Sequence, residues 1–175
     1  FTSGSTGIPK GIVHSVKGYL LYACFSSEYF FGLNKDSIML CASDCAWING
    51  HTYSIFGPLL IGATSILLDK PSLLLNPINF NLIIKEYNPT HLYLPVTLIR
   101  LMKDINKSLI KYETNKSITC IGSMGEPLAN SVGNWFANFF NAPARGFPAT
   151  RRMVAIICVW IGERDSKSKS DAGQC

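Results

Sequence analysis

The sequence has no apolar run long enough to cross a bilayer. The longest one near its end, residues 153–161, is well short of the roughly 20 residues that a membrane helix needs, and no secretory signal is visible. With 47% hydrophobic residues among 175, the chain has the apolar content to bury a core of about one domain. We therefore expect a soluble, cytoplasmic protein without a membrane partner.

Paired metal ligands and a strong charge are also missing. The six cysteines lack the paired spacing of a zinc site, and they are Cys24, Cys41, Cys45, Cys120, Cys158 and Cys175. We expect most of them to be buried, reduced thiols, which suits a cytoplasmic protein. Residues 1–141 contain ten Lys or Arg against eight Asp or Glu, so they give no reason to expect nucleic acid as a partner.

Two common phosphate motifs are absent, yet the first eleven residues have a composition that suits phosphate. There is no Gly-x-Gly-x-x-Gly pattern, and Lys10 is not followed by the Ser or Thr of a Walker A motif. Residues 1–11 read Phe-Thr-Ser-Gly-Ser-Thr-Gly-Ile-Pro-Lys-Gly. Hydroxyl and amide groups donate to phosphate oxygens, and Lys10 adds a positive charge. A Gly/Ser linker is the plain alternative, but Pro9 fixes a turn just before Lys10.

The rest of the chain alternates between strand-like and helix-like segments. The expected strands are residues 38–41, 64–68, 91–94 and 117–121, and the expected helices are residues 18–31, 55–61, 77–87, 98–105 and 132–140. This alternation predicts an α/β fold, with a layered, largely parallel sheet and flanking helices. Ligands bind beyond the carboxyl ends of such strands. The polar residues 42–51 and 122–127 follow two of the strands and are therefore the candidate site segments.

Each candidate segment also has a purely structural interpretation. Residues 43–53 combine a carboxylate, an indole, an amide and an imidazole, which fits a site wall and a packed loop equally well. Asp44 would then cap the following helix, and His51 would be a core histidine. No Ser-His-Asp order supports a hydrolase. Residues 122–127, Gly-Ser-Met-Gly-Glu-Pro, also fit a simple turn into a helix.

Four segments together carry a resemblance to a known family. Residues 1–11 resemble the phosphate-binding signature of the AMP-forming adenylating superfamily, which includes acyl-CoA synthetases, luciferases and peptide-synthetase adenylation domains. Residues 43–53 are similar to the acetyl-CoA synthetase motif Ala-Asp-x-Gly-Trp-x-x-Gly-His-x-Tyr, with the Gly-Pro-Leu and Gly-Ala-Thr that follow it. Residues 94–100 and 122–127 match Ala-Pro-Thr-Ala-Ile-Arg and Gly-Ser-x-Gly-Glu-Pro. The chain therefore resembles part of the large N-terminal domain of such an enzyme.

The resemblance implies roles for particular residues. The ATP-binding residues would be Thr2, Ser3, Gly4, Ser5, Thr6, Gly7 and Lys10 on the phosphates, and Gly125, Glu126 and Pro127 on the nucleoside. The acyl pocket would be formed by Trp47, Ile48, Asn49 and Met124, and Asn49 would also approach CoA. Ile48 and Met124 would narrow this pocket and disfavour bulky acids. Asn49 stands where the family usually has Thr, which leaves acetate and propionate as alternatives.

The resemblance stops after residue 141. The family continues with Trp-Trp-Gln-Thr-Glu-Thr-Gly, which closes the acyl pocket and helps to hold magnesium, and residues 142–153 do not match it. Residues 163–175 have the composition of a disordered tail. We interpret residues 1–141 as a partial AMP-binding (adenylation) domain and residues 142–175 as a divergent, disordered or frameshifted tail. No metal ligand is assigned, and the family's catalytic lysine belongs to a C-terminal domain that this chain does not match.

The implied activity is the ATP-dependent activation of acetate, or another short acid, to an acyl-adenylate and then to acyl-CoA. The substrates and cofactors would be ATP, CoA and Mg²⁺, and the products AMP and pyrophosphate. The partners would be these small molecules alone, and nothing implies an oligomeric state. We expect the 175-residue chain by itself to be inactive. A propionyl-CoA synthetase-like ligase and a non-enzymatic remnant are the alternatives.

Overall fold

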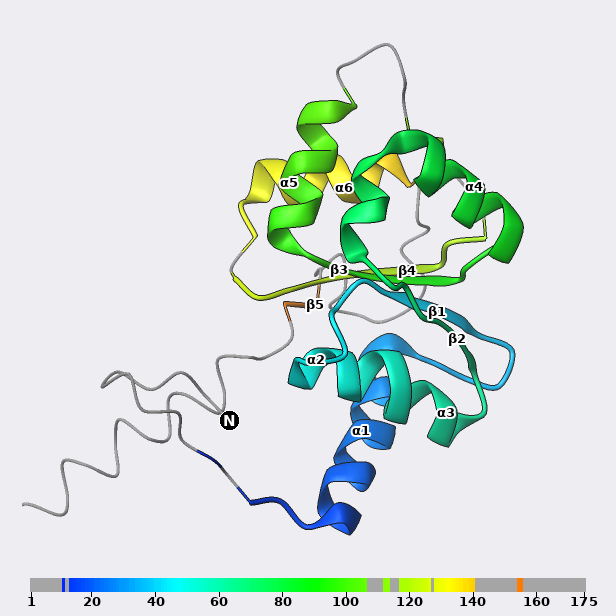
Figure 1. The fold of residues 1–175 in the computed structure, drawn as a ribbon, viewed down its shortest axis with the longest axis vertical. Coiled ribbons are helices and arrows are strands. Elements are labelled where there is room, and N and C mark those ends of the chain that lie inside the picture. The colour runs from blue at the N-terminus through cyan, green and yellow to red at the C-terminus, as the bar shows by residue number, and fades with distance from the viewer. Residues whose placement is uncertain are drawn as a thin grey trace, which may run out of the picture.

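One parallel sheet runs through the molecule (Figure 1). The computed structural model describes residues 11, 13–106, 112–113, 117–126, 128–140 and 154–155. Within these, five strands lie in the order β2-β1-β3-β4-β5, and every neighbouring pair is parallel. The strands are β1 (Ile38–Cys41), β2 (Thr64–Ile66), β3 (His91–Pro95), β4 (Cys120–Met124) and β5 (Val154–Ala155). The predicted α/β fold with a parallel sheet is confirmed.

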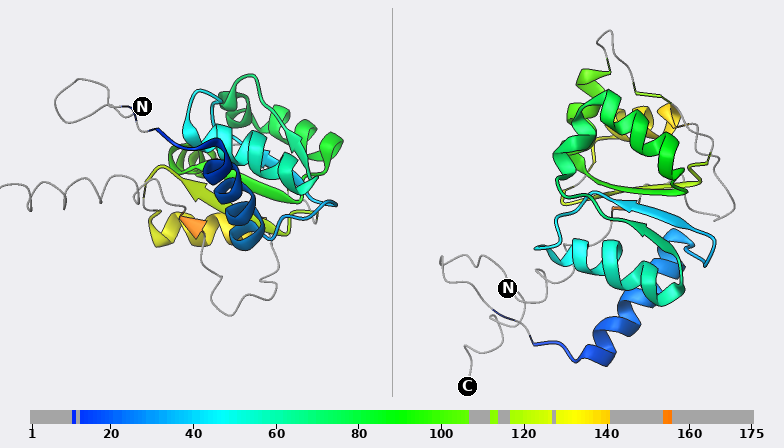
Figure 2. Two further views of the ribbon diagram at one scale, coloured as in Figure 1. Left: turned by 90° about the horizontal axis from the view of Figure 1, so that it is seen from below. Right: turned by 45° about the vertical axis from the view of Figure 1, so that its right-hand side comes forward.

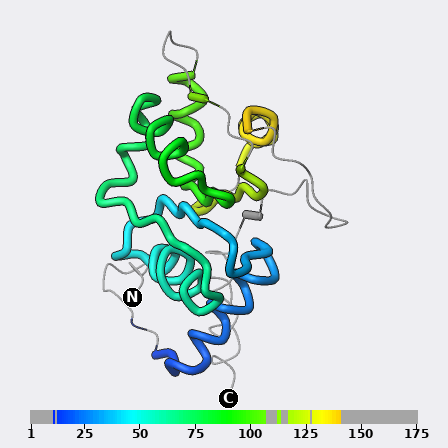
Figure 3. Tube along the Cα trace, turned by 90° about the vertical axis from the view of Figure 1, so that its right-hand side faces the viewer, coloured from blue at the N-terminus to red at the C-terminus, as the bar shows by residue number. Residues whose placement is uncertain are grey.

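Helices cover both faces of the sheet (Figure 2, Figure 3). One face carries α1 (Val16–Phe31), α2 (Ile48–Gly50), the π-helix η1 (His51–Phe56) and α3 (Gly57–Ile61). The other face carries the 3₁₀ helix η2 (Pro71–Leu75), α4 (Pro77–Tyr87), α5 (Val96–Ile105) and α6 (Asn130–Phe139). None of the helices in the described part of the chain has both the length and the apolar character needed to span a membrane.

The helix boundaries follow from local chemistry. The Ser15 hydroxyl accepts a hydrogen bond from the Gly18 amide at 3.1 Å and caps α1, which ends at Gly32 in the left-handed region with φ 68°. The Asn76 side chain caps α4 in the same way through the Ile78 amide at 2.9 Å. Asn88 ends this helix with φ 50°. The predicted helix over residues 77–87 is therefore confirmed.

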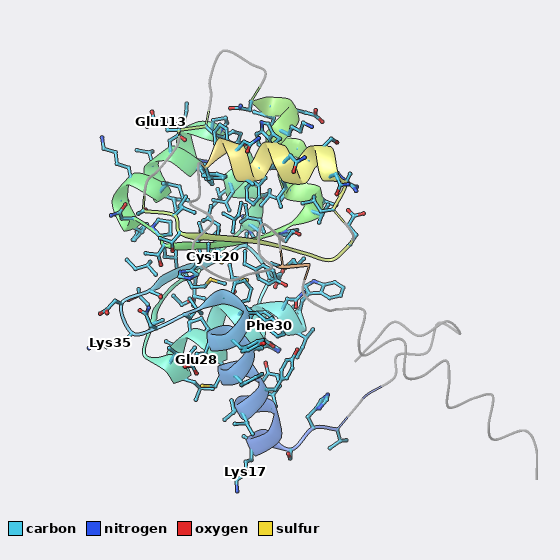
Figure 4. All side chains as sticks on the ribbon, turned by 180° about the vertical axis from the view of Figure 1, so that it is seen from behind. Lys17, Glu28, Phe30, Lys35, Glu113 and Cys120 are labelled. Carbon is cyan, nitrogen blue, oxygen red and sulfur yellow. The ribbon has the colours of Figure 1, made fainter. Side chains whose placement is uncertain are left out.

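Two apolar clusters hold the helices to the sheet (Figure 4). The larger cluster lies between the sheet and α4, α5 and α6, and Leu92, Leu94 and Phe136 are at its centre. The smaller cluster contains Phe31 and Tyr53, and Phe30 and Cys120, both labelled in Figure 4, pack against it. Burial of these side chains supplies the main stabilising free energy, at roughly 25 cal/mol for each Å² of apolar surface.

The helical run from α2 to α3 contains a wide π turn for a local reason. Pro58 has no amide hydrogen, so the Ser54 carbonyl loses its normal helical donor. That carbonyl instead accepts a hydrogen bond from the Ser65 hydroxyl on β2. Gly57 allows α1 to approach closely, because a Cβ there would overlap the Ser27 hydroxyl. The backbone of this run is therefore shaped by its contacts with β2 and α1.

Strand β4 begins three residues later than the sequence predicted. The expected strand was residues 117–121, and residues 122–127 were interpreted as a turn, whereas β4 extends through Gly122 and Ser123 to Met124. The parallel register with β3 fixes this position, because His91 pairs with Cys120 and Pro95 with Met124. Glycine suits position 122 of this strand because the Tyr93 and Phe31 rings would lie only 3.0 and 3.2 Å from a Cβ there.

A buried histidine joins β3 to both α1 and β1. His91 Nε2 lies 3.0 Å from the Phe31 carbonyl oxygen, and Nδ1 lies 2.7 Å from the Thr90 hydroxyl. A carbonyl oxygen only accepts, so Nε2 carries the proton of the neutral ring, and the Thr90 hydroxyl donates to Nδ1. The same hydroxyl oxygen accepts from the Ile38 amide at 2.8 Å. Burial lowers the pKa of His91, although its bond to Phe31 opposes this effect.

This pKa shift predicts that stability depends on pH below neutrality. The unfolded chain takes up a proton on His91 near pH 6.5, whereas the folded chain takes it up only at a lower pH. The stabilising contribution is therefore complete above pH 6.5 and is lost as the pH falls through the folded-state pKa. The free energy of unfolding, measured by chemical denaturation, should fall between pH 8 and pH 5. The His91→Gln variant should show a smaller fall, by up to about 1.4 kcal/mol for each pH unit. The exposed His14, changed to Gln, is the control, and equal profiles for both variants would contradict this account.

Candidate functional site

The candidate segments leave the sheet at its carboxyl edge. Cys41 pairs with Tyr93, and Pro95 pairs with Met124, so β1, β3 and β4 end at the same edge. Because neighbouring strands lie about 4.8 Å apart and β4 ends about two residues further along β3 than β1 does, the chain leaves β1 and β4 at points about 12 Å apart, one on each side of β3. The strand order reverses between β1 and β3, which is where ligands bind in open parallel sheets.

A tight turn follows β1. The Asp44 carbonyl accepts a hydrogen bond from the Trp47 amide at 3.0 Å, and the Asp44 carboxylate accepts one from the Ala46 amide at 2.8 Å. Asp44 therefore shapes the turn, whereas the residue at the N-cap position of α2 is Trp47. The interpretation of Asp44 as a helix cap is wrong, because its carboxylate bonds to an amide that precedes the helix.

Gly50 lets this turn fold back onto the start of the helix. A Cβ on Gly50 would overlap the Asp44 carbonyl oxygen and would lie 2.9 Å from the Cys45 Cα. These are backbone atoms, which do not move aside as a flexible side chain does. Glycine at this position is therefore required for residues 44–47 to lie where they do.

The proposed acyl-pocket residues divide into exposed and buried side chains. Trp47 is 69% exposed and Ile48 is 45% exposed, whereas Asn49 is half-buried. Met124 is buried and belongs to the same apolar cluster as Tyr53, on the face that carries η1. The structure thus brings all four to one edge and one face of the sheet. The exposed indole and the Ile48 side chain offer an apolar surface to a small molecule.

The helical run that carries Trp47 and Asn49 is fixed by hydroxyl groups that sequence reasoning missed. The Thr52 and Tyr19 hydroxyls lie 3.0 Å apart, the Ser54 hydroxyl donates to the Cys41 carbonyl at 3.3 Å, and the Tyr53 hydroxyl donates to Ser26 at 3.3 Å. Three consecutive hydroxyl residues in an otherwise apolar segment were the available signal. His51, by contrast, is exposed, so it is not a core histidine.

A second turn follows β4 and carries an ion pair. Gly125 has φ 96°, a backbone conformation that other residues adopt only with strain. Glu126 follows it, and its Oε1 lies 3.2 Å from Nη1 of Arg100 on α5. The two side chains are 39% and 44% exposed, so water screens this interaction. The turn presents a carboxylate that can accept hydrogen bonds from the hydroxyl or amino groups of a ligand.

The described cysteines are free thiols, as expected, but only Cys41 is fully buried. Cys24 and Cys120 are half-buried and Cys45 is exposed. Burial raises the pKa of the Cys41 thiol to about 12 and that of Cys120 to about 11. Both groups are therefore protonated at neutral pH and are not nucleophiles.

Several predicted site residues lie outside the described part of the chain. They are Thr2, Ser3, Gly4, Ser5, Thr6, Gly7, Lys10 and Pro127. Within the described ranges, no group of three or more His, Cys, Asp or Glu side chains is placed to hold a metal ion. No metal ligand is therefore assigned among the described residues.

Comparison with known proteins links this geometry to a family. The sequence model of the AMP-binding enzyme family matches residues 1–173. The chain is 38% identical over 140 residues to acetyl-coenzyme A synthetase 2 of Candida albicans, which covers 79% of the chain and 21% of that protein. It is 39% identical over 137 residues to acetyl-coenzyme A synthetase 1 of Saccharomyces cerevisiae, which covers 78% of the chain and 19% of that protein.

A third relative, acetyl-coenzyme A synthetase 1 of Debaryomyces hansenii, is 40% identical over 136 residues, with 78% of the chain and 20% of that protein covered. The chain thus spans about a fifth of the length of the curated relatives it matches. The family model covers nearly the whole chain, and so the chain belongs to the AMP-binding enzyme family.

Proposed function

We propose that the chain is the nucleotide-binding and acid-binding part of an AMP-forming acetate–CoA ligase. In the first step, the acetate carboxylate attacks the α-phosphorus of ATP, and pyrophosphate leaves. In the second step, the CoA thiol attacks the carbonyl carbon of the adenylate, and AMP leaves. The names of the relatives, all acetyl-coenzyme A synthetases, support this assignment.

The observation that carries the proposal is the shared position of the two motif segments. The turn after β1 and the turn after β4 flank β3 at the carboxyl edge, about 12 Å apart. An acyl-adenylate has a short acid at one end and a nucleoside at the other, so it needs two such neighbouring segments. In this assignment Gly125, Glu126 and Pro127 bind the nucleoside, and the Glu126 carboxylate accepts hydrogen bonds from it.

The phosphate and acyl ends are assigned to the remaining residues. Thr2, Ser3, Gly4, Ser5, Thr6, Gly7 and Lys10 would hold the β- and γ-phosphates. Trp47, Ile48, Asn49 and Met124 would form the acyl pocket, and Asn49 would also approach CoA. The exposed Trp47 and Ile48 supply the apolar contact. Because no metal ligand is assigned among the described residues, we derive no step through the metal ion.

A ladder of acyl-adenylate mimics tests the assignment without requiring turnover. Adenosine 5′-alkylphosphates with ethyl, propyl, butyl and hexyl chains should be titrated into the 175-residue chain by calorimetry. We expect the tightest binding for ethyl or propyl and at least about tenfold weaker binding for hexyl, since one misfitting methylene costs about 1–3 kcal/mol. An optimum at propyl would favour the propionate alternative. Absence of saturable binding, or an optimum at hexyl, would contradict the proposal.

A single methyl group on Gly50 tests the acyl pocket separately. Gly50→Ala forces residues 44–45 away from the helix and should move Trp47. We expect about tenfold weaker binding of the ethyl ester, as for a misplaced contact worth about 1.4 kcal/mol, while AMP binds within about twofold of its original affinity.

The matched control for this variant is Gly57→Ala. It also creates a close contact in the same helical run, but with the Ser27 hydroxyl of α1 and the Thr52 carbonyl of η1. Both variants should lower the melting temperature. If Gly57→Ala selectively weakened binding of the ethyl ester to the same extent, the weaker binding caused by Gly50→Ala would reflect general packing damage. The assigned role of residues 44–47 would then be wrong.

A further inference from the structure

Helix α5 carries two cations, one turn apart, of which Arg100 reaches the connection between β4 and α6 and Lys103 reaches the first turn of α6. Arg100 Nη1 lies 3.2 Å from Glu126 Oε1 at the start of this connection. Lys103 Nζ donates a hydrogen bond to the Ser131 carbonyl oxygen at 3.2 Å, in the first turn of α6. The spacing i, i+3 places both side chains on one face of α5. Figure 1 shows α5 and α6 side by side over β3 and β4.

We propose that Arg100 is a positioning residue for the nucleoside-binding turn and acts by holding the Glu126 carboxylate. This inference rests on the proposed function, which gives Gly125 and Glu126 to the nucleoside side of ATP. Arg100 does not touch the nucleotide. It sets the direction of the carboxylate that does.

Within the described residues, Glu126 is preceded by Gly125, and glycine has more backbone freedom than any other residue. The base of Arg100, by contrast, is firmly held, because its neighbours Ile99 and Met102 are completely buried against the sheet. The rigid fork of the guanidinium adds direction to this support. Helix α5 therefore restrains the turn through Arg100.

A direct contact of Arg100 with phosphate would give a different signature. A phosphate ligand matters for ATP and not for adenosine, which has no phosphate. A residue that positions Glu126 matters equally for both, because both carry the nucleoside. The ratio of the two affinity losses therefore separates positioning from direct phosphate binding.

Titration of adenosine and of ATP into the 175-residue chain provides the test. Arg100→Gln should weaken the binding of both ligands by about two- to fivefold, which is the range for an ion pair that remains accessible to water. Arg100→Lys should recover part of the loss. In the Glu126→Gln background, Arg100→Gln should cause no further loss, because the partner of the guanidinium is already absent. Lys103→Gln is the matched control, and we expect it to leave both affinities unchanged.

Each outcome separates this inference from the proposed function. If the unaltered chain binds ATP but Arg100→Gln binds both ligands normally, the inference is wrong and the proposed function stands. A loss confined to ATP would make Arg100 a phosphate ligand and would also overturn the inference. Equal losses for Arg100→Gln and Lys103→Gln would show a general effect of positive charge on α5. If the unaltered chain binds neither ligand, the proposed function fails, and the inference fails with it.

Discussion

The parallel pairing of β3 with both β1 and β4 is the constraint on which the site depends. The register ends all three strands at one edge, with Tyr93 opposite Cys41 and Met124 opposite Pro95. The two turns that carry the motif residues then have no freedom to separate. Gly122 contributes to this register, because its missing side chain makes room for the rings of Tyr93 and Phe31. A change in this packing would therefore alter the site without touching a site residue.

Both turns depend on contacts with neighbouring elements as well as on their own residues. The turn after β1 rests against the backbone of Gly50, and η1 behind it is anchored by hydroxyl groups to α1 and β1. The turn after β4 begins at a glycine with positive φ and is reached by Arg100 from α5. Each face of the sheet thus contributes one support, so the two halves of the site depend on different apolar clusters.

The sequence predicted the fold wherever a local signal was complete. The helix predicted over residues 77–87 is α4, and those predicted over residues 98–105 and 132–140 lie within two residues of the bounds of α5 and α6. Prediction failed at β4, because glycine and serine are read locally as turn residues, whereas here an aromatic ring from β3 requires the glycine. It also missed the π-helix, which arises from Pro58 and from a contact with Ser65 on a different strand.

For the site, sequence resemblance supplied the candidate residues but not their supports. Trp47, Ile48, Asn49 and Met124 were predicted together, and the structure brings them to one edge and one face of the sheet. Arg100 was noted only as the last residue of a segment that matches the family. Its partner Glu126 is 26 residues away, so no local pattern could have revealed the pair.

A crystal structure of the chain with adenosine 5′-ethylphosphate would test the central claim most directly. The account predicts that the nucleoside lies against Gly125 and Glu126 and that the ethyl group lies against Trp47 and Ile48. The ligand would then extend across the carboxyl end of β3. A ligand bound at the opposite edge of the sheet, or against α1 away from these two turns, would contradict it.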